Sequence, residues 1–260
     1  MRKENKKGVE YFTFEIFNQY DFLKHGFSTR KGGFSKDYYS SMNLRLGSDD
    51  SLECVKKNFD IFLDVFDLKI NNTVSTNQVH GKNIIQVKKF KENSELSDGL
   101  ITDLEEIGLM TFHGDCIPVF FADIKKKVVA LVHSGWRGTF KGISVEMIDL
   151  MVNTYDSNLA DIIVGIGPGI GECCYAVGLE VFNQFISKDE AYRKFFTKKN
   201  DKYMMDLKKI IQFDLLREGI FVKNIEVSKL CTKCNMDLFF SHRGHGLKRG
   251  GMAAIIKKVR

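Results

Sequence analysis

Residues 107–142, IGLMTFHGDCIPVFFADIKKKVVALVHSGWRGTFKG, contain the pattern that decides the fold. Two apolar, strand-like runs flank a basic turn of three lysines. The first run carries Cys116 and the second carries His133, and each of these residues is a potential metal ligand or nucleophile. The second run then enters a glycine-bracketed turn, residues 134–138, before a helix-like segment. A strand-to-helix junction displays side chains at the end of a sheet, so we expect a functional site there.

A third candidate ligand, His80, lies upstream in the segment STNQVHG. We predict that His80, Cys116 and His133 converge. Two imidazoles and one thiolate suit Zn²⁺, and three protein ligands leave a fourth position open, as in catalytic zinc sites. Copper is an alternative, because His/Cys sites also bind it. Equally compatible with the residues alone is a small buried Cys116 and two core histidines.

His113 and Asp115 lie close to Cys116 in the chain. On a continuous strand, His113 would face away from Cys116, because odd offsets alternate between the faces of a sheet. His113 could instead support the ligands or contact substrate. Asp115 could orient a ligand or act in proton transfer, and a simple turn aspartate fits equally well.

Three arginines lie in glycine-rich surroundings, namely Arg30, Arg137 and Arg243. The planar guanidinium group suits phosphate or carboxylate, so these arginines are candidate substrate contacts. Arg137 is the best placed, because it lies beside the expected N-terminus of a helix, which is itself favourable to anions.

Other motifs favour no additional chemistry. The glycines within residues 165–171 do not have the spacing of a dinucleotide-binding loop. Cys231 and Cys234 form one C-x-x-C without a second such pair, and the adjacent Cys173 and Cys174 make a poor joint chelate. We therefore favour a structural or incidental role for these four cysteines over a second metal site.

Composition places the chain among globular proteins. It has 260 residues, is 43% hydrophobic and carries a formal net charge of +6 with both signs interspersed. Because no basic block is interleaved with aromatic residues, we expect no nucleic-acid partner. No apolar run is long enough to span a bilayer, and the charged N-terminus lacks the apolar region of a signal peptide. We expect a cytoplasmic protein, a monomer or homodimer, with six reduced cysteines.

Strand and helix patterns mix without strict alternation, which favours an α+β fold in one domain, residues 1–260. We expect strands at residues 11–16, 73–79, 83–87, 162–166, 225–230, 239–240 and 253–256, and a strand followed by a turn within residues 25–35. Helices are expected at residues 51–66, 139–155, 179–185 and 207–218, with Asp206 as an N-cap.

Six segments together resemble successive blocks of the YfiH/YlmD family, also labelled polyphenol oxidase or multicopper oxidoreductase laccase. They are STNQVHG, DGLIT, HGDCIPVFFAD, VALVHSGWRGTFKGI, GIGPGIGECCYAVGLEV and LCTKCNMDLFFSHRG. The resemblance extends from about His25 to the C-terminus. In the family's closing block, Arg243 matches the first arginine, whereas Gly244 and His245 replace the next two residues. The later arginine is either replaced by Gly251 or displaced to Arg249.

The resemblance implies a layered α/β/β/α arrangement around a mixed β-sandwich, resembling the catalytic domain of cytotoxic necrotizing factor. It also implies metal ligands at His80, Cys116 and His133. The implied activity is phosphorolysis of adenosine, inosine, guanosine or methylthioadenosine to base and ribose-1-phosphate, so that purine nucleosides and phosphate are the expected partners. Adenosine deamination is an implied second activity.

Three rival functions stay open. A Cys116 nucleophile with His133 as base would make a thiol hydrolase or deamidase. A copper-dependent phenol oxidase is the second, although six histidines without an H-x-H or H-C-H motif do not supply the clusters of a laccase. The third rival is a non-enzymatic partner in peptidoglycan assembly or cell division, which no feature of the sequence supports.

Overall fold

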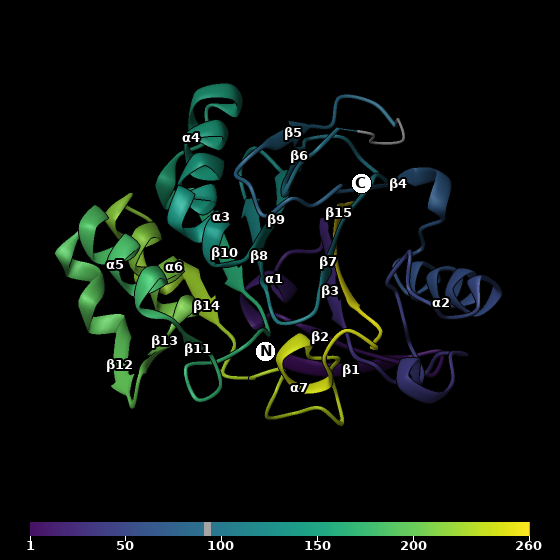
Figure 1. Ribbon diagram of the computed structural model, residues 1–260. Helices are drawn as coiled ribbons and strands as arrows, with labels where there is room; N and C mark the ends of the chain where they lie inside the picture. Colours follow the sequence, from purple (N-terminus) through teal and green to yellow (C-terminus); the bar gives the residue numbers. More distant parts are fainter. Residues whose placement is uncertain (91–94, 260) are drawn as a thin grey trace.

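Two six-stranded mixed sheets form the centre of the molecule, seen in the computed structural model, which describes residues 1–90 and 95–259 (Figure 1). The first sheet has the order β1 (Arg2–Lys6), β2 (Val9–Thr13), β3 (Leu23–Ser28), β15 (Met252–Lys258), β7 (Gly108–His113) and β4 (Thr73–Ser75). The second has the order β14 (Ile225–Val227), β10 (Ile162–Ile166), β8 (Ile117–Asp123), β9 (Val128–Ser134), β6 (Gly99–Thr102) and β5 (Ile84–Gln86). A small third sheet contains β11 (Ala176–Val177), β13 (Lys202–Met205) and β12 (Phe196–Lys199).

Helices cover the outer faces of both large sheets. The α-helices of the described residues are α1 (Glu15–Asn18), α2 (Leu52–Asp64), α3 (Trp136–Lys141), α4 (Ile143–Tyr155), α5 (Leu179–Lys188), α6 (Leu207–Arg217) and α7 (His242–His245). Short 3₁₀ turns lie at η1 (Asp37–Tyr39), η2 (Ile70–Asn72), η3 (Leu159–Asp161), η4 (Glu190–Phe195) and η5 (Val222–Asn224). None of the helices in the described residues is long and apolar enough to cross a membrane.

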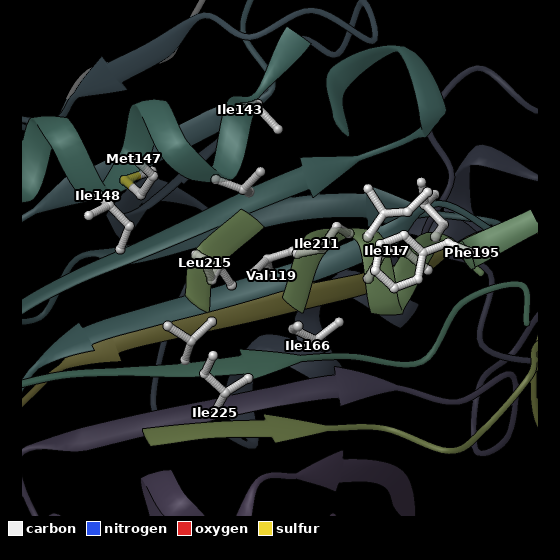
Figure 2. Packing of buried hydrophobic residues seen from close by; sticks show 14 of the residues in the cluster. Ile117, Val119, Ile143, Met147, Ile148, Ile166, Phe195, Ile211, Leu215 and Ile225 are labelled. Carbon is white, nitrogen blue, oxygen red and sulfur yellow. The ribbon is translucent and has the colours of Figure 1, made fainter. Parts of the chain in front are cut away.

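Three hydrophobic cores separate four layers and confirm the expected α/β/β/α order. One core lies between the two sheets and includes Phe27, Leu109 and Phe120. A second joins the outer face of the second sheet to α4, α5 and α6, and Figure 2 shows Met147 of α4 and Ile211 of α6 in it. A third packs α2 against the outer face of the first sheet. The fold is mixed α+β.

The hairpin of β8 and β9 lies at the centre of this arrangement. All fourteen of its strand residues are buried, because its sheet is covered on both faces. Val119 and Phe121 join the core beneath the helices, while Phe120 and Ala122 join the core between the sheets. This double burial explains why both strands are almost continuously apolar in sequence.

The expected elements are largely present, with several corrections. Strand β10 occupies the predicted range, and α6 begins after Asp206, whose side chain accepts from the Lys209 amide. The helix expected at residues 139–155 is divided in two at Gly142, whose φ of 81° ends α3. The strand expected at residues 11–16 stops at Thr13, and α1 follows. The strand expected at 239–240 is wrong, since both phenylalanines are buried outside any strand.

Replacement of Phe120 by alanine tests the core between the sheets. The Phe120 side chain is fully buried, and its ring lies 5.3 Å from the ring of Phe14. We expect Phe120→Ala to lower the free energy of unfolding by about 3–5 kcal/mol, measured by denaturant titration. Phe221→Ala, at a half-exposed ring, is the control and should change it by less than about 0.5 kcal/mol. Equal losses in the two variants would contradict this account of the core.

Candidate metal and substrate site

The β8–β9 hairpin brings Cys116 and His133 together. Cys116 directly precedes β8, and His133 lies near the end of β9. Antiparallel pairing aligns Pro118 with His133, so the start of one strand meets the end of the other. The thiol and the imidazole therefore lie at the same edge of the second sheet.

Asp98 attaches the loop of His80 to this edge. Its fully buried carboxylate accepts hydrogen bonds from the amides of Val79, His80 and Gly81 at 3.2, 3.0 and 2.7 Å. The Nδ1 of His133 donates to the same carboxylate at 2.8 Å. Pairing of β6 with β9 sets Asp98 beside His133, whose amide donates to the Asp98 carbonyl at 2.7 Å. One side chain thus orients both candidate histidine ligands.

The donor atoms of His80, Cys116 and His133 all lie within 4.8 Å of one another. His80 Nδ1 is 4.0 Å from Cys116 Sγ, and the His80 and His133 ring centroids are 4.9 Å apart. His80 is exposed while His133 is buried, so the group is accessible from one side. Because His133 Nδ1 is engaged by Asp98, its Nε2 is the nitrogen available as a ligand.

The space between these donors is preserved by Gly135. A Cβ atom at this position would lie 2.9 Å from His80 Nδ1 and 3.0 Å from Cys116 Sγ. A side chain there would occupy the place of an ion. The N₂S donor set and the glycine-lined space both fit a metal such as zinc.

The site is electrostatically organised around a thiolate. Burial opposes ionisation of Cys116, but the positive charge of His133 and hydrogen bonds from His133 and His80 lower the pKa of its thiol to about 6. Burial likewise disfavours the charged His133, yet Cys116 and Asp98 raise its pKa to about 9. Cys116 and His133 are thus a thiolate–imidazolium pair when no metal is bound.

His113 lies beside the ligands rather than facing away from them. Its strand ends at His113, and Asp115 has a φ of 104°, so strand alternation does not extend to Cys116. Of the two placements that the sequence left open, the structure therefore has His113 beside the ligands and at the cavity. His113 Nδ1 donates to the Cys116 carbonyl at 3.1 Å, and its Nε2 accepts from Thr111 Oγ1 at 2.7 Å. Burial and the charge of His133 keep the pKa of His113 well below its usual value.

Asp115 connects three loops. Its buried carboxylate accepts from Thr232 Oγ1 at 2.6 Å and from the Arg243 amide at 2.7 Å. One carboxylate oxygen therefore holds the Thr232 loop and the other holds the backbone at Arg243. This geometry favours a positioning role over proton transfer.

A cavity of about 460 Å³ opens over the metal-ligand group. This volume lies in the range of pockets that hold small molecules. Four arginines line it, namely Arg45, Arg137, Arg243 and Arg249. In the described part of the chain these guanidinium groups contact backbone carbonyls and aromatic rings instead of carboxylates. Their uncompensated charge favours an anionic ligand.

Arg249 is the most constrained of these arginines. Its Nε is buried without a hydrogen-bond partner, and its Nη1 donates to the Gly250 carbonyl. Burial and the adjacent charge of Arg45 lower its pKa. A bound anion would satisfy this cation.

Arg30 does not line this cavity. Its guanidinium group donates to the carbonyls of Ser40 and Met236, at 2.8 and 2.9 Å, and lies 4.6 Å from the Phe240 ring centroid. It lines a separate hollow of about 910 Å³ that contains no member of the metal-ligand group.

The sequence interpretation missed the functional contributions of Asp98 and Arg45. The only signal for Asp98 was its position directly before an apolar strand, in the segment DGLIT. Arg45 follows an irregular segment, where no periodicity relates it to the site. Trp136 and Tyr175 also line the cavity, and each ring contacts a guanidinium group, Arg137 and Arg243 respectively.

Comparisons with known proteins agree with this architecture. The chain is 32% identical over 244 residues to the purine nucleoside phosphorylase YlmD of Bacillus subtilis, covering 89% of this chain and 87% of that protein. It is 33% identical over 242 residues to the purine nucleoside phosphorylase YlmD of Geobacillus stearothermophilus, covering 89% and 88%. The crystal structure of Bacillus licheniformis hypothetical protein YfiH superposes with a TM-score of 0.90 at 32% identity, covering 98% of each chain.

A family model described as multi-copper polyphenol oxidoreductase laccase matches residues 24–258. The match covers the second large sheet, the first large sheet except β1, β2 and the first residue of β3, and every residue that lines the cavity. This chain therefore belongs to the multi-copper polyphenol oxidoreductase laccase family, together with YfiH and YlmD.

Proposed function

We propose that this protein is a purine nucleoside phosphorylase acting on adenosine, inosine, guanosine and methylthioadenosine. The observation that carries the proposal is a single cavity that joins a His/Cys/His donor group to four arginines. Relatives from two bacteria are named purine nucleoside phosphorylases, which supplies the substrate class. Because a thiolate ligand requires reduced cysteine, we propose that the enzyme works in the cytoplasm.

The arginines would bind phosphate in this reaction. A phosphate oxygen forms a bond to C1′ of the ribose while the bond from C1′ to N9 of the purine breaks. The electron pair of that bond goes to the purine, which takes the proton that the hydrogen phosphate gives up. Ribose-1-phosphate remains, or its 5-methylthio analogue when methylthioadenosine is the substrate. Arg45, Arg137, Arg243 and Arg249 would hold the phosphate against C1′ and offset its charge.

His80, Cys116 and His133 would hold a metal ion, zinc by donor type and copper as the alternative. When bound, the ion would supply a Lewis acid. Asp98 would keep both histidines oriented, and His113 would fix the backbone at Cys116 without itself transferring a proton. Trp136 and Tyr175 offer aromatic surfaces for the purine. Deamination of adenosine, in which water replaces ammonia at C6, is proposed as a side activity.

A thiol hydrolase or deamidase is the second candidate, favoured by the thiolate–imidazolium pair of Cys116 and His133. That reaction would need no metal. A phenol oxidase of the laccase type is less well supported, because the three donors of the His/Cys/His group in the described residues would suffice for one ion and not for a multicopper cluster.

Phosphate-dependent release of hypoxanthine from inosine tests the proposed function. We expect His80→Ala to lower the rate by more than about 10²-fold, because one of three metal ligands is lost. Lys82→Ala is the control in the same loop, where Lys82 forms only an exposed ion pair with Glu146, and it should keep full activity. Release that does not require phosphate, or that survives in His80→Ala, would refute this mechanism.

Gly135→Ala tests the metal site without removing a ligand. Its φ of −82° accepts alanine without strain, so the main change is a methyl group between His80 and Cys116. We expect the zinc affinity, measured by competition with a chromogenic chelator, to fall at least about tenfold. Gly81→Ala is the control, because its new Cβ would approach Asp98 at an ordinary 3.4 Å. Unchanged affinity in Gly135→Ala would place the ion elsewhere.

The pH dependence of Cys116 alkylation measures the thiolate. The reactive form is the thiolate, and the pKa of Cys116 is about 6, so iodoacetamide labelling of metal-free protein should be half-maximal near pH 6. Loss of the positive partner in His133→Ala should move this midpoint upward by at least about one unit. Peptide mass spectrometry follows Cys116 alone. A midpoint above pH 8 in the unmodified chain would argue against the ion pair and against the thiol-hydrolase candidate.

A further inference from the structure

A second group of donor atoms lies outside the cavity. The fold brings together Cys173 and Cys174, in the turn before β11, with Cys231 and Cys234, in the loop after β14. Their four Sγ atoms lie within 4.8 Å of one another. The C-x-x-C that had no partner pair in sequence therefore has one in space.

The sulfur separations fit a metal site. Cys234 Sγ lies 3.4 Å from both Cys173 Sγ and Cys174 Sγ. A disulfide would require about 2.05 Å. Four sulfurs at about 2.3 Å from a tetrahedral zinc ion lie about 3.8 Å apart. The observed spacing is thus close to that of a zinc tetrathiolate, and adjacency in sequence does not prevent Cys173 and Cys174 from sharing a centre.

Backbone hydrogen bonds hold the two cysteine pairs together. The Thr232 amide donates to the Gly169 carbonyl at 3.1 Å, which joins the two loops. The Cys174 amide donates to the Gly171 carbonyl at 2.9 Å and closes the turn. The Gly171 amide donates to Cys231 Sγ at 3.2 Å, an interaction that favours a thiolate. A Cβ at Gly171 would lie only 3.3 Å from Cys173 Sγ, so glycine leaves room for the sulfurs.

A buried cation accompanies this group. Lys208 is 6% exposed, and its ammonium donates to the carbonyls of Ser228 and Leu230. It lies near enough to Cys231 and Cys173 for their charges to interact with its own. Four thiolates around Zn²⁺ carry a net charge of −2, which this lysine would partly offset.

We propose that Cys173, Cys174, Cys231 and Cys234 form a structural zinc site, distinct from the His80, Cys116 and His133 group. The four thiols release their protons to solvent and bind Zn²⁺ without a change in oxidation state. Four protein ligands leave no open coordination position, so this site stabilises the fold and performs no chemistry of its own. The choice of zinc follows from the all-sulfur tetrahedral donor set.

The site would secure one wall of the catalytic cavity. Tyr175, directly after Cys174, lines the cavity, and its ring lies 5.1 Å from the Arg243 guanidinium carbon. Arg243 Nη1 donates to the Ala176 carbonyl at 2.7 Å. On the other loop, Thr232 follows Cys231 and donates to Asp115. An ion between the loops therefore restricts residues that contact substrate in the proposed function.

Metal content of the full chain tests this site without measuring activity. Purified protein is stripped of metal under reducing conditions, reloaded with Zn²⁺, gel-filtered and analysed by inductively coupled plasma mass spectrometry. We expect two zinc ions per chain. His80→Ala/His133→Ala and Cys231→Ser/Cys234→Ser should each retain one. Cys54→Ser, which alters a thiol in α2 outside both groups, should retain two.

Cobalt spectra and thiol protection separate the two sites even where a variant folds poorly. Co²⁺ bound to His80→Ala/His133→Ala should give intense sulfur-to-cobalt charge transfer typical of four thiolates. In the unmodified chain, Zn²⁺ should slow alkylation of Cys173 and Cys234 at least tenfold, although both are exposed. No loss of zinc in Cys231→Ser/Cys234→Ser, no zinc retained in His80→Ala/His133→Ala, or alkylation of Cys173 and Cys234 unaffected by Zn²⁺ would each overturn the proposal.

Discussion

The site depends on the hydrogen bonds that the buried carboxylate of Asp98 accepts. This carboxylate accepts three backbone amides and one imidazole, so no oxygen of this desolvated anion lacks a partner. His80 has a φ of 57°, in the left-handed region that costs about 1–2 kcal/mol for a residue with a Cβ. A hydrogen bond to a charged group contributes about 1.5–3 kcal/mol, enough to offset that strain. The Asp98 carboxylate thereby fixes the strained, exposed loop of His80 next to His133 on the buried strand β9.

Asp115, which lines the cavity, likewise holds neighbouring segments in place. It ties the loop before β8 to the Thr232 loop and to the first turn of α7. The cavity is consequently built by connections between segments far apart in the chain, while the β8–β9 hairpin supplies a rigid base. Both buried aspartates accept hydrogen bonds at each carboxylate oxygen, so each holds neighbouring loops in place. Their contribution to chemistry is through position, and the groups that can ionise usefully are Cys116 and His133.

Sequence patterns correctly predicted the features that depend on interactions close along the chain. The range of β10, the Asp206 cap and the convergence of Cys116 with His133 follow from strand burial, capping and hairpin geometry. Features set by long-range contacts were missed or misread. The sequence left two placements open for His113, because periodicity does not reveal that the strand ends there. The strand predicted at Phe239 and Phe240 is absent. Both residues are apolar because they are buried between the sheets, and such burial does not require strand pairing.

The closing block of the chain shows that the place of an arginine in the sequence does not by itself decide where its guanidinium group lies. The resemblance implies that Gly244 and His245 replace residues of the family pattern, yet the cavity contains two guanidinium groups from this segment, those of Arg243 and Arg249. The long side chain of Arg249 brings its positive charge to Gly114, where any Cβ would lie 2.6 Å from Arg249 Nη1. The cation thus depends on a glycine more than one hundred residues away. The physical requirement is positive charge over the ligand group, and Arg249 meets it where the opposing wall, at Gly114, lacks a side chain.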